Sequence, residues 1–257
     1  MIDFIKNITQ QFDAFLNKIN EMHSGNLVSF MWKNNDDYNI NPNDGKKYFN
    51  LNKPEAKFSI KAIGEVLELA DTHNSYSSLN EQIQNLKNKS FNNFSDLSYP
   101  HPPLFMSYRK FDSEKQSETW NAFKSFTFFI PELILINNSS ANYIIFNFIL
   151  NNPQNKIIAK QELTEWMKKI SKDSLINNSI ISSQTAEVHN EILHWKELVK
   201  DAVNHLSNGK LNKIVLSRFK KLIILQKPNW NELVAHLSKE FPQCYKRFIT
   251  PAFNFLQ

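Results

Sequence analysis

Apolar side chains that recur every three or four residues predict the helices of this chain. The first such stripe runs through residues 2–22, and a second sustained stripe runs through residues 188–207. Shorter stripes predict a helix at residues 163–170 and another that begins after Pro228. A weak stripe within the polar stretch 71–100 indicates a connection or a surface helix.

Short apolar runs between these stripes predict β-strands. They cover residues 27–32, 48–51, 57–63, 126–136, 143–150, 212–218, 222–225 and 245–250. Pro131 interrupts one run and indicates a bend or an edge position, because proline cannot donate a hydrogen bond to a neighbouring strand. The run 143–150 is apolar at odd and even positions alike, which indicates burial on both faces. The loop 137–142 before it predicts a hairpin.

This mixture of elements predicts an α+β fold, in which helices pack outside a layered and largely antiparallel sheet. Of the 257 residues, 41% are hydrophobic and 21% are charged, which is enough apolar surface to bury a core. No internal repeat and no shift in composition marks a linker. We therefore expect a single domain over residues 1–257.

Composition excludes several classes of site. With 4 glycines, the chain has no glycine-rich loop for nucleotide phosphates. Its single cysteine, Cys244, can form neither an internal disulfide nor a cysteine-based zinc cluster, and it favours a reducing, cytoplasmic location. We interpret Cys244 as a half-buried strand residue rather than as a catalytic thiol. No apolar run is long enough to span a membrane, so we expect no membrane partner.

The net charge of +5 has three interpretations: a surface for nucleic acid, an attraction for a small anion, or a solvated surface with excess lysine. The lysines are scattered through polar stretches, and neither an arginine cluster nor a nucleic-acid-binding motif is present. The solvated surface is therefore favoured, and nucleic acid is not expected as a partner. The 7 histidines are dispersed, so no metal site is expected from them.

The run from Lys213 to Arg218 is the best candidate for chemistry. It follows a predicted helix that ends at Asn208-Gly209, where glycine suits a left-handed turn. A lysine at the start of an apolar strand would be partly desolvated, which disfavours its ammonium form and lets it act as a general base. The alternative is a lysine whose stem covers apolar surface while its amine reaches water. The residue pattern alone favours this alternative.

A helix with Trp195, then Gly209, then the run 213–218 is similar to the helix-to-strand segment of the chorismate-utilising enzymes. Earlier segments agree with this resemblance. They are Tyr48-Phe49, Ala62-Ile63-Gly64, Phe105, Phe111-Asp112, Trp120, Phe123 and Ile130-Pro131. The resemblance covers most of the chain and is specific only in the run 213–218. It implies the anthranilate synthase-like fold, in which two pseudo-equivalent halves enclose the site.

Lys213 distinguishes activities within this family. Relatives that add ammonia to chorismate usually have glutamine at the matching position, whereas those that add water have lysine. Water needs a base when it attacks the ring, while ammonia is already nucleophilic. The resemblance therefore implies an isochorismate synthase, which is an isomerase, or a related salicylate synthase. Lys213 would activate water for attack at ring carbon 2, a glutamic acid would protonate the hydroxyl leaving carbon 4, and Mg²⁺ would hold the substrate carboxylate.

The chain departs from the family pattern near its end. The Gly-Ala-Thr-Pro-Glu segment expected after residues 241–255 is absent, and the acid glutamate, the Mg²⁺ ligands and the carboxylate-binding arginine beyond it have no counterpart. We therefore expect a truncated copy, with residues 1–185 as the N-terminal half and residues 186–257 as the start of the catalytic half. Such a chain would associate through exposed sheet surface. The alternative is an inactive fragment, or a scaffold or binding protein of the same fold. Menaquinone biosynthesis is the expected pathway, and siderophore synthesis is the alternative.

Overall fold

A computed structural model describes most of the chain. The described residues are 2–19, 26–36, 38–40, 46–70, 76–97, 105–109, 126–170, 183–184, 189–209, 211–216, 223–224 and 230–250. The chain divides into two compact units. The larger unit comprises Met1–Ile176 and Val234–Gln257, and the smaller unit comprises Asn177–Leu233.

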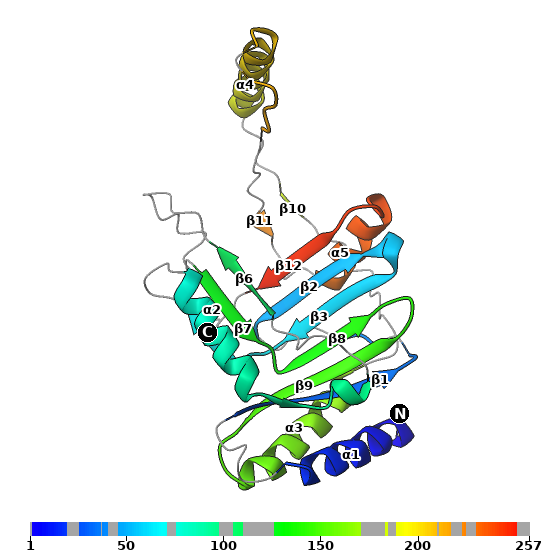
Figure 1. Cartoon of the computed structure of the whole chain (residues 1–257). Helices are drawn as coiled ribbons and strands as arrows, with labels where there is room; N and C mark the ends of the chain where they lie inside the picture. The colour runs from blue at the N-terminus through cyan, green and yellow to red at the C-terminus, as the bar shows by residue number, and fades with distance from the viewer. Residues whose placement is uncertain are drawn as a thin grey trace. The chain divides into compact units, whose positions relative to one another are not determined.

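Every helix predicted from an apolar stripe is present. The helices are α1 (Ile2–Asn17), α2 (Tyr76–Lys89), α3 (Gln154–Lys169), α4 (His189–Ser207) and α5 (Trp230–Glu240), with short 3₁₀ helices η2 (Pro54–Ala56) and η3 (Ser95–Leu97) (Figure 1). α3 begins before the apolar stripe that predicted it. Its first turns face solvent, where Ile157 and Ile158 are exposed, so these turns have no apolar stripe although their residues are good helix formers.

α1 ends at Asn17 and does not continue toward residue 22 as predicted. A lysine from a neighbouring helix accounts for this end. Lys156 Nζ of α3 donates to the carbonyl oxygens of Leu16 at 3.1 Å and Ile19 at 2.7 Å. A cation at a helix C-terminus satisfies free carbonyl groups and opposes the negative end of the helix dipole.

The strands form two sheets in the larger unit. They are β1 (Asn26–Asn34), β2 (Tyr48–Lys53), β3 (Phe58–Ile63), β4 (Leu67–Ala70), β5 (Phe91–Asn92), β6 (Phe105–Arg109), β7 (Phe126–Ile130), β8 (Leu133–Asn137), β9 (Asn142–Leu150) and β12 (Lys246–Thr250). The seven-stranded sheet has the order β12-β2-β3-β8-β9-β1-β5, and the three-stranded sheet has the order β4-β7-β6. Among the described strands of these two sheets, only β5 pairs in parallel, with β1, so the predicted largely antiparallel sheet is confirmed.

Pro131 marks the point at which the chain leaves one sheet for the other. β7 before it is the middle strand of the smaller sheet, and β8 after it lies inside the larger sheet. The bend predicted from Pro131 is therefore confirmed, and the edge position is not. Asn147 of β9 holds this crossing, because its Nδ2 donates to the Pro131 carbonyl at 2.8 Å and its backbone N–H donates to Glu132 O at 2.8 Å.

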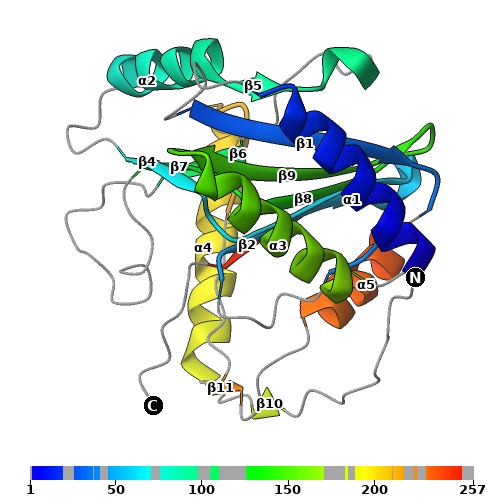
Figure 2. The same ribbon diagram turned by 90° about the horizontal axis from the view of Figure 1, so that it is seen from below.

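Two apolar layers enclose the larger sheet. α1 and α3 lie side by side over one face, where Phe12 and Leu163 are both 0% exposed (Figures 1 and 2). On the opposite face, Phe129 of β7 and Phe94 pack with side chains of the sheet. β9 therefore has buried side chains on both faces, as predicted from its continuous apolar run.

β12 forms one edge of this sheet, although it lies far along the sequence from its partner strand. It pairs antiparallel with β2, with Arg247 opposite Leu51 and Phe248 opposite Asn50. The strand itself was predicted near residues 245–250, but its partner was not. Cys244, just before it, is exposed in a turn that closes on Phe241, so the interpretation as a half-buried strand residue is wrong.

The smaller unit contains α4 and a short antiparallel pair, β10 (Ser183–Gln184) with β11 (Ile223–Ile224). The strand predicted over residues 212–218 is wrong for its described part. Residues 212–216 form no strand, and Val215 is 78% exposed. An apolar run alone does not make a strand, because its backbone groups also need a neighbouring strand to pair with. No strand in the described part of the chain pairs with this run.

Candidate functional site

Lys213 lies in an exposed segment just after α4. The helix ends as predicted, with Gly209 at a φ of 66° and its N–H donating to the carbonyl of Leu206 at 3.0 Å. Glycine adopts this left-handed backbone without the steric cost of a Cβ atom. The segment 211–216 then runs without regular structure, and the Lys213 side chain is exposed.

This placement changes the physical argument for Lys213. The predicted partial desolvation of its amine depended on a strand, and that strand is absent from residues 212–216. The Lys213 side chain is instead exposed to solvent. Its companions Ser217 and Arg218 lie outside the described residues. A role in catalysis for Lys213 therefore stays a prediction.

A half-buried cation lies just before β2. The Lys47 ammonium contacts the carboxylates of Glu65 and Glu68, and its side chain is 15% exposed. Burial lowers the pKa of Lys47, but hydrogen bonds from the ammonium to the two carboxylates, and their charges, outweigh burial and raise it. Lys47 is therefore a fixed cation, and it is unsuited to act as a base.

A second ion pair lies next to Trp166 of α3. Lys46 Nζ lies 2.6 Å from Glu132 Oε2 and 4.9 Å from the centre of the Trp166 ring. Glu162 faces this pair, and its pKa is raised by burial and by the charge of Glu132, against the opposing effect of Lys46. These contacts were not predicted, because the paired residues lie far apart along the chain.

Gly64 packs against this second ion pair. It belongs to the Ala62-Ile63-Gly64 step of the family resemblance and has a φ of 75°. A Cβ atom at this position would lie 2.6 Å from Cδ of Glu132, which is closer than real contacts allow. The positive φ therefore favours glycine here, and a Cβ atom would in addition make the flexible Glu132 side chain shift.

The described residues do not fit the Mg²⁺ site that the resemblance implies. Within the described part of the chain, no three His, Cys, Asp or Glu side chains are grouped so that they could hold a metal ion. We therefore assign no step of a reaction to Mg²⁺ here. Among the described helices, none is both long and apolar enough to cross a bilayer.

The other residues of the resemblance divide into two groups. Phe105 in β6 and Ile130-Pro131 lie on described elements, at the smaller sheet and at the crossing between the sheets. Phe111-Asp112, Trp120 and Phe123 lie outside the described residues. Asn147, which was not singled out from the sequence, is 2% exposed and also accepts a hydrogen bond from Ser29 Oγ at 2.6 Å. A buried asparagine within a continuous apolar run was the signal that could have found it.

Residues 13–252 match the protein family described as chorismate binding enzyme. Among solved structures, the chain is similar to MenF, the menaquinone-specific isochorismate synthase from Escherichia coli, with 12% sequence identity and a TM-score of 0.60. The match covers 96% of this chain and 52% of the MenF chain, so this chain spans about half the length of MenF. At this identity the likeness concerns the fold. No curated protein matches the sequence.

Proposed function

The chain belongs to the chorismate-binding enzyme family, and from this premise we propose that it is an isochorismate synthase in which Lys213 activates the attacking water. The observation that carries the proposal is lysine, rather than glutamine, at the start of the run 213–218. The fold agrees with the proposal, because it is the chorismate-utilising fold of MenF. The use of isochorismate in menaquinone synthesis is part of the proposal and rests on the same likeness.

The proposed step conserves atoms and charge. The Lys213 amine takes a proton from water as the water oxygen bonds to carbon 2 of chorismate. The ring double bonds shift, and the bond between carbon 4 and its hydroxyl breaks. An acidic group protonates this hydroxyl as it leaves, so one water enters and one water departs. The base in this step must contact the attacking water and must be uncharged when it takes the proton, so the proposal requires that bound substrate exclude water from the Lys213 amine.

A second candidate is a non-catalytic protein that binds chorismate or a partner with the same scaffold. Two observations favour it. Lys213 is exposed in a segment without regular structure, and the described residues bring together no metal-binding group. Both candidates place chorismate on the protein, so the experiment must separate binding from turnover.

We would measure isochorismate formation by the purified chain with chorismate and Mg²⁺, and compare Lys213→Gln. General-base catalysis contributes on the order of 10²- to 10⁴-fold, so the variant should lose at least about 100-fold in kcat with a smaller change in KM. Glutamine keeps much of the side-chain volume and cannot accept the proton from water.

Lys200→Gln on exposed α4 is the matched control, and it should turn over chorismate like the parent chain. Equal activity of the parent and Lys213→Gln would refute Lys213 as the base. A folded parent chain that binds chorismate by titration calorimetry, but forms no isochorismate, would instead select the non-catalytic candidate.

A further inference from the structure

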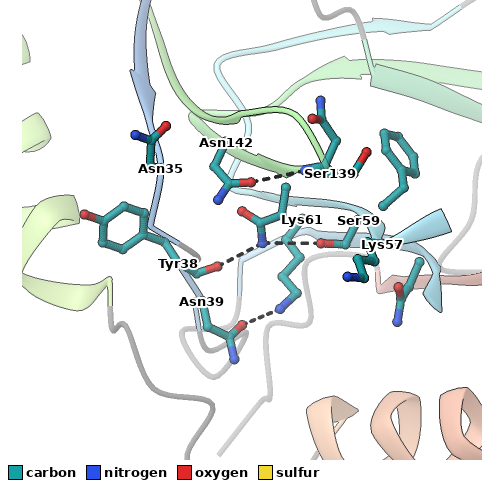
Figure 3. Close-up of a pocket in the computed structure, with 12 residues that line it drawn as sticks. Asn35, Tyr38, Asn39, Lys57, Ser59, Lys61, Ser139 and Asn142 are labelled. Carbon is teal, nitrogen blue, oxygen red and sulfur yellow. Dashed lines mark hydrogen bonds between the residues drawn. The ribbon is translucent and has the colours of Figure 1, made fainter. Parts of the chain in front are cut away.

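A polar pocket of about 620 Å³ opens at one end of the seven-stranded sheet. Two strand registers bring its walls together, because Asn137 of β8 lies opposite Ser59 of β3 and opposite Asn142 of β9. The segment that follows β1 forms a further wall with Tyr38 and Asn39 (Figure 3). The volume of the pocket is typical of sites for small molecules.

Two asparagines of the pocket wall are held by their amide oxygens. Asn39 Oδ1 accepts a hydrogen bond from Lys61 Nζ at 2.6 Å (Figure 3). Asn138 Oδ1 accepts from the backbone N–H groups of Ser140 and Ala141, each at 2.8 Å. An ammonium and a backbone N–H can only donate, so the oxygen of each amide must face them. The Nδ2 of each asparagine makes no hydrogen bond among the described residues and remains a donor.

Two other asparagines of the wall are held by their amide nitrogens. Asn137 Nδ2 donates to the Tyr38 carbonyl at 3.3 Å, and Asn52 Nδ2 donates to Ser238 Oγ at 2.9 Å. The Ser238 hydroxyl already donates to the Val234 carbonyl at 2.6 Å, so it can only accept from Asn52. Within the described part of the chain, the Oδ1 atoms of Asn137 and Asn52 accept no hydrogen bond and remain acceptors.

The wall therefore offers two donors and two acceptors whose orientations are fixed before a ligand binds, which lowers the entropy cost of binding. A ligand hydroxyl group both donates and accepts, so it can use both kinds of amide group. An ionised carboxylate only accepts, and it would leave the two amide oxygens without a donor. Phe58 also lines the pocket and is partly buried, so its ring provides an apolar surface for the C–H groups of a sugar ring.

The two lysines of the pocket wall are not assigned to a ligand. Lys61 donates to Asn39 and has a further interaction as well, so its ammonium is engaged and serves to hold Asn39 in place. The Lys57 side chain is exposed, where water and salt screen its charge. Recognition in this pocket therefore rests on its amide groups rather than on a charge.

We propose that this pocket binds a neutral polyhydroxylated ligand, namely a mono- or disaccharide. Its hydroxyl groups donate to Oδ1 of Asn137 and Asn52, and they accept from Nδ2 of Asn39 and Asn138. A pocket of this volume holds a sugar of one or two rings. The proposal is independent of the proposed function, because the pocket belongs to the larger unit and Lys213 to the smaller one.

The test is an NMR titration of the isotope-labelled full chain with neutral and matched probes. Glucose, maltose and myo-inositol are the neutral probes. Glucuronate is glucose with a carboxylate in place of its hydroxymethyl group, and tetrahydropyran-2-methanol is glucose without its ring hydroxyl groups. We expect at least one neutral probe to shift the side-chain amide resonances of Asn39, Asn137 and Asn138 saturably, and tetrahydropyran-2-methanol to bind at least roughly tenfold more weakly. Tighter binding of glucuronate than of every neutral probe, or no saturable shift from any neutral probe at about 10 mM, would overturn the proposal.

Two variants and a control locate the binding site. Asn39→Ala removes one free donor, and Asn137→Ala removes one free acceptor. Each should weaken binding of the best neutral probe by roughly threefold or more, and both together by roughly tenfold or more. Asn204→Ala, at an exposed position of α4, is the matched control and should leave binding unchanged. If Asn137→Ala unfolds the chain, Asn39→Ala decides the outcome, and unchanged affinity in Asn39→Ala contradicts the proposal.

Discussion

Gly64 illustrates how one residue can carry both a backbone and a packing requirement. Gly64→Ala should lower the free energy of unfolding by about 1–3 kcal/mol, because alanine pays for the positive φ and its Cβ displaces Glu132 from Lys46. Urea denaturation at neutral pH measures this loss.

The packing part of this cost can be isolated with Glu132→Ala as background. There the new methyl group meets no Glu132 side chain, so only the cost of the backbone conformation should remain. An equal loss for Gly64→Ala in both backgrounds would show that the close approach to Glu132 does not matter.

Tyr38 should make stability depend on alkaline pH. Burial, and then the carboxylate of Asp36, raises the pKa of its phenol to about 12, whereas an unfolded tyrosine titrates near 10. The folded state therefore holds this proton more tightly. The resulting contribution to the free energy of unfolding is about 1–3 kcal/mol. It is complete below pH 10 and is lost as the pH rises from 10 through 12.

The measurement is urea unfolding at pH 9 and pH 11.5 for the parent chain and Tyr38→Phe. The variant should lose less stability between these pH values than the parent. Tyr245→Phe is the control, because Tyr245 is 63% exposed, and this variant should show the full alkaline loss. An alkaline loss in Tyr38→Phe as large as in the parent contradicts the assignment.

At the scale of elements, α1 shows how an apolar stripe becomes a packed layer. Phe12 is 0% exposed, and its ring lies 5.0 Å from Phe30, 5.8 Å from Phe146 and 5.9 Å from Phe148 between ring centres. These rings come from β1 and β9, so the helix is fixed to the part of the sheet that these two strands form. Edge-to-face aromatic contacts add to the gain from burial.

Phe12→Ala should therefore destabilise the larger unit by about 3–5 kcal/mol, through lost burial and the cavity that remains. Phe241→Ala is the matched control, because Phe241 is 52% exposed, and its effect should stay within about 0.5 kcal/mol. Thermal and urea unfolding would both detect the difference. A loss below about 1 kcal/mol for Phe12→Ala would contradict the packing of α1 on the sheet.

At the scale of the whole molecule, most of the contacts that build the fold join distant parts of the chain. β12 pairs with β2 across nearly the full sequence, and β1 pairs with β9 along its entire length. The chain divides into two compact units, and the single domain with two halves that the sequence predicted stays a prediction. Residues 234–257 belong to the larger unit with the N-terminal strands, because β12 extends their sheet.

Local pattern alone determined which segments form helices, where Pro131 bends the chain, and that β9 is buried on both faces, because each depends on side-chain periodicity or on one residue's backbone. It also supported the family, through the run from Lys213 to Arg218, although the structure places Lys213 in an exposed segment rather than on a strand. Tertiary structure alone decided the order of the strands, the ion pairs of Lys46 and Lys47, and the asparagine-lined pocket beside Lys61. The reason is physical: a strand pair, an ion pair or a pocket needs groups from distant segments, and a local pattern does not specify which segments meet.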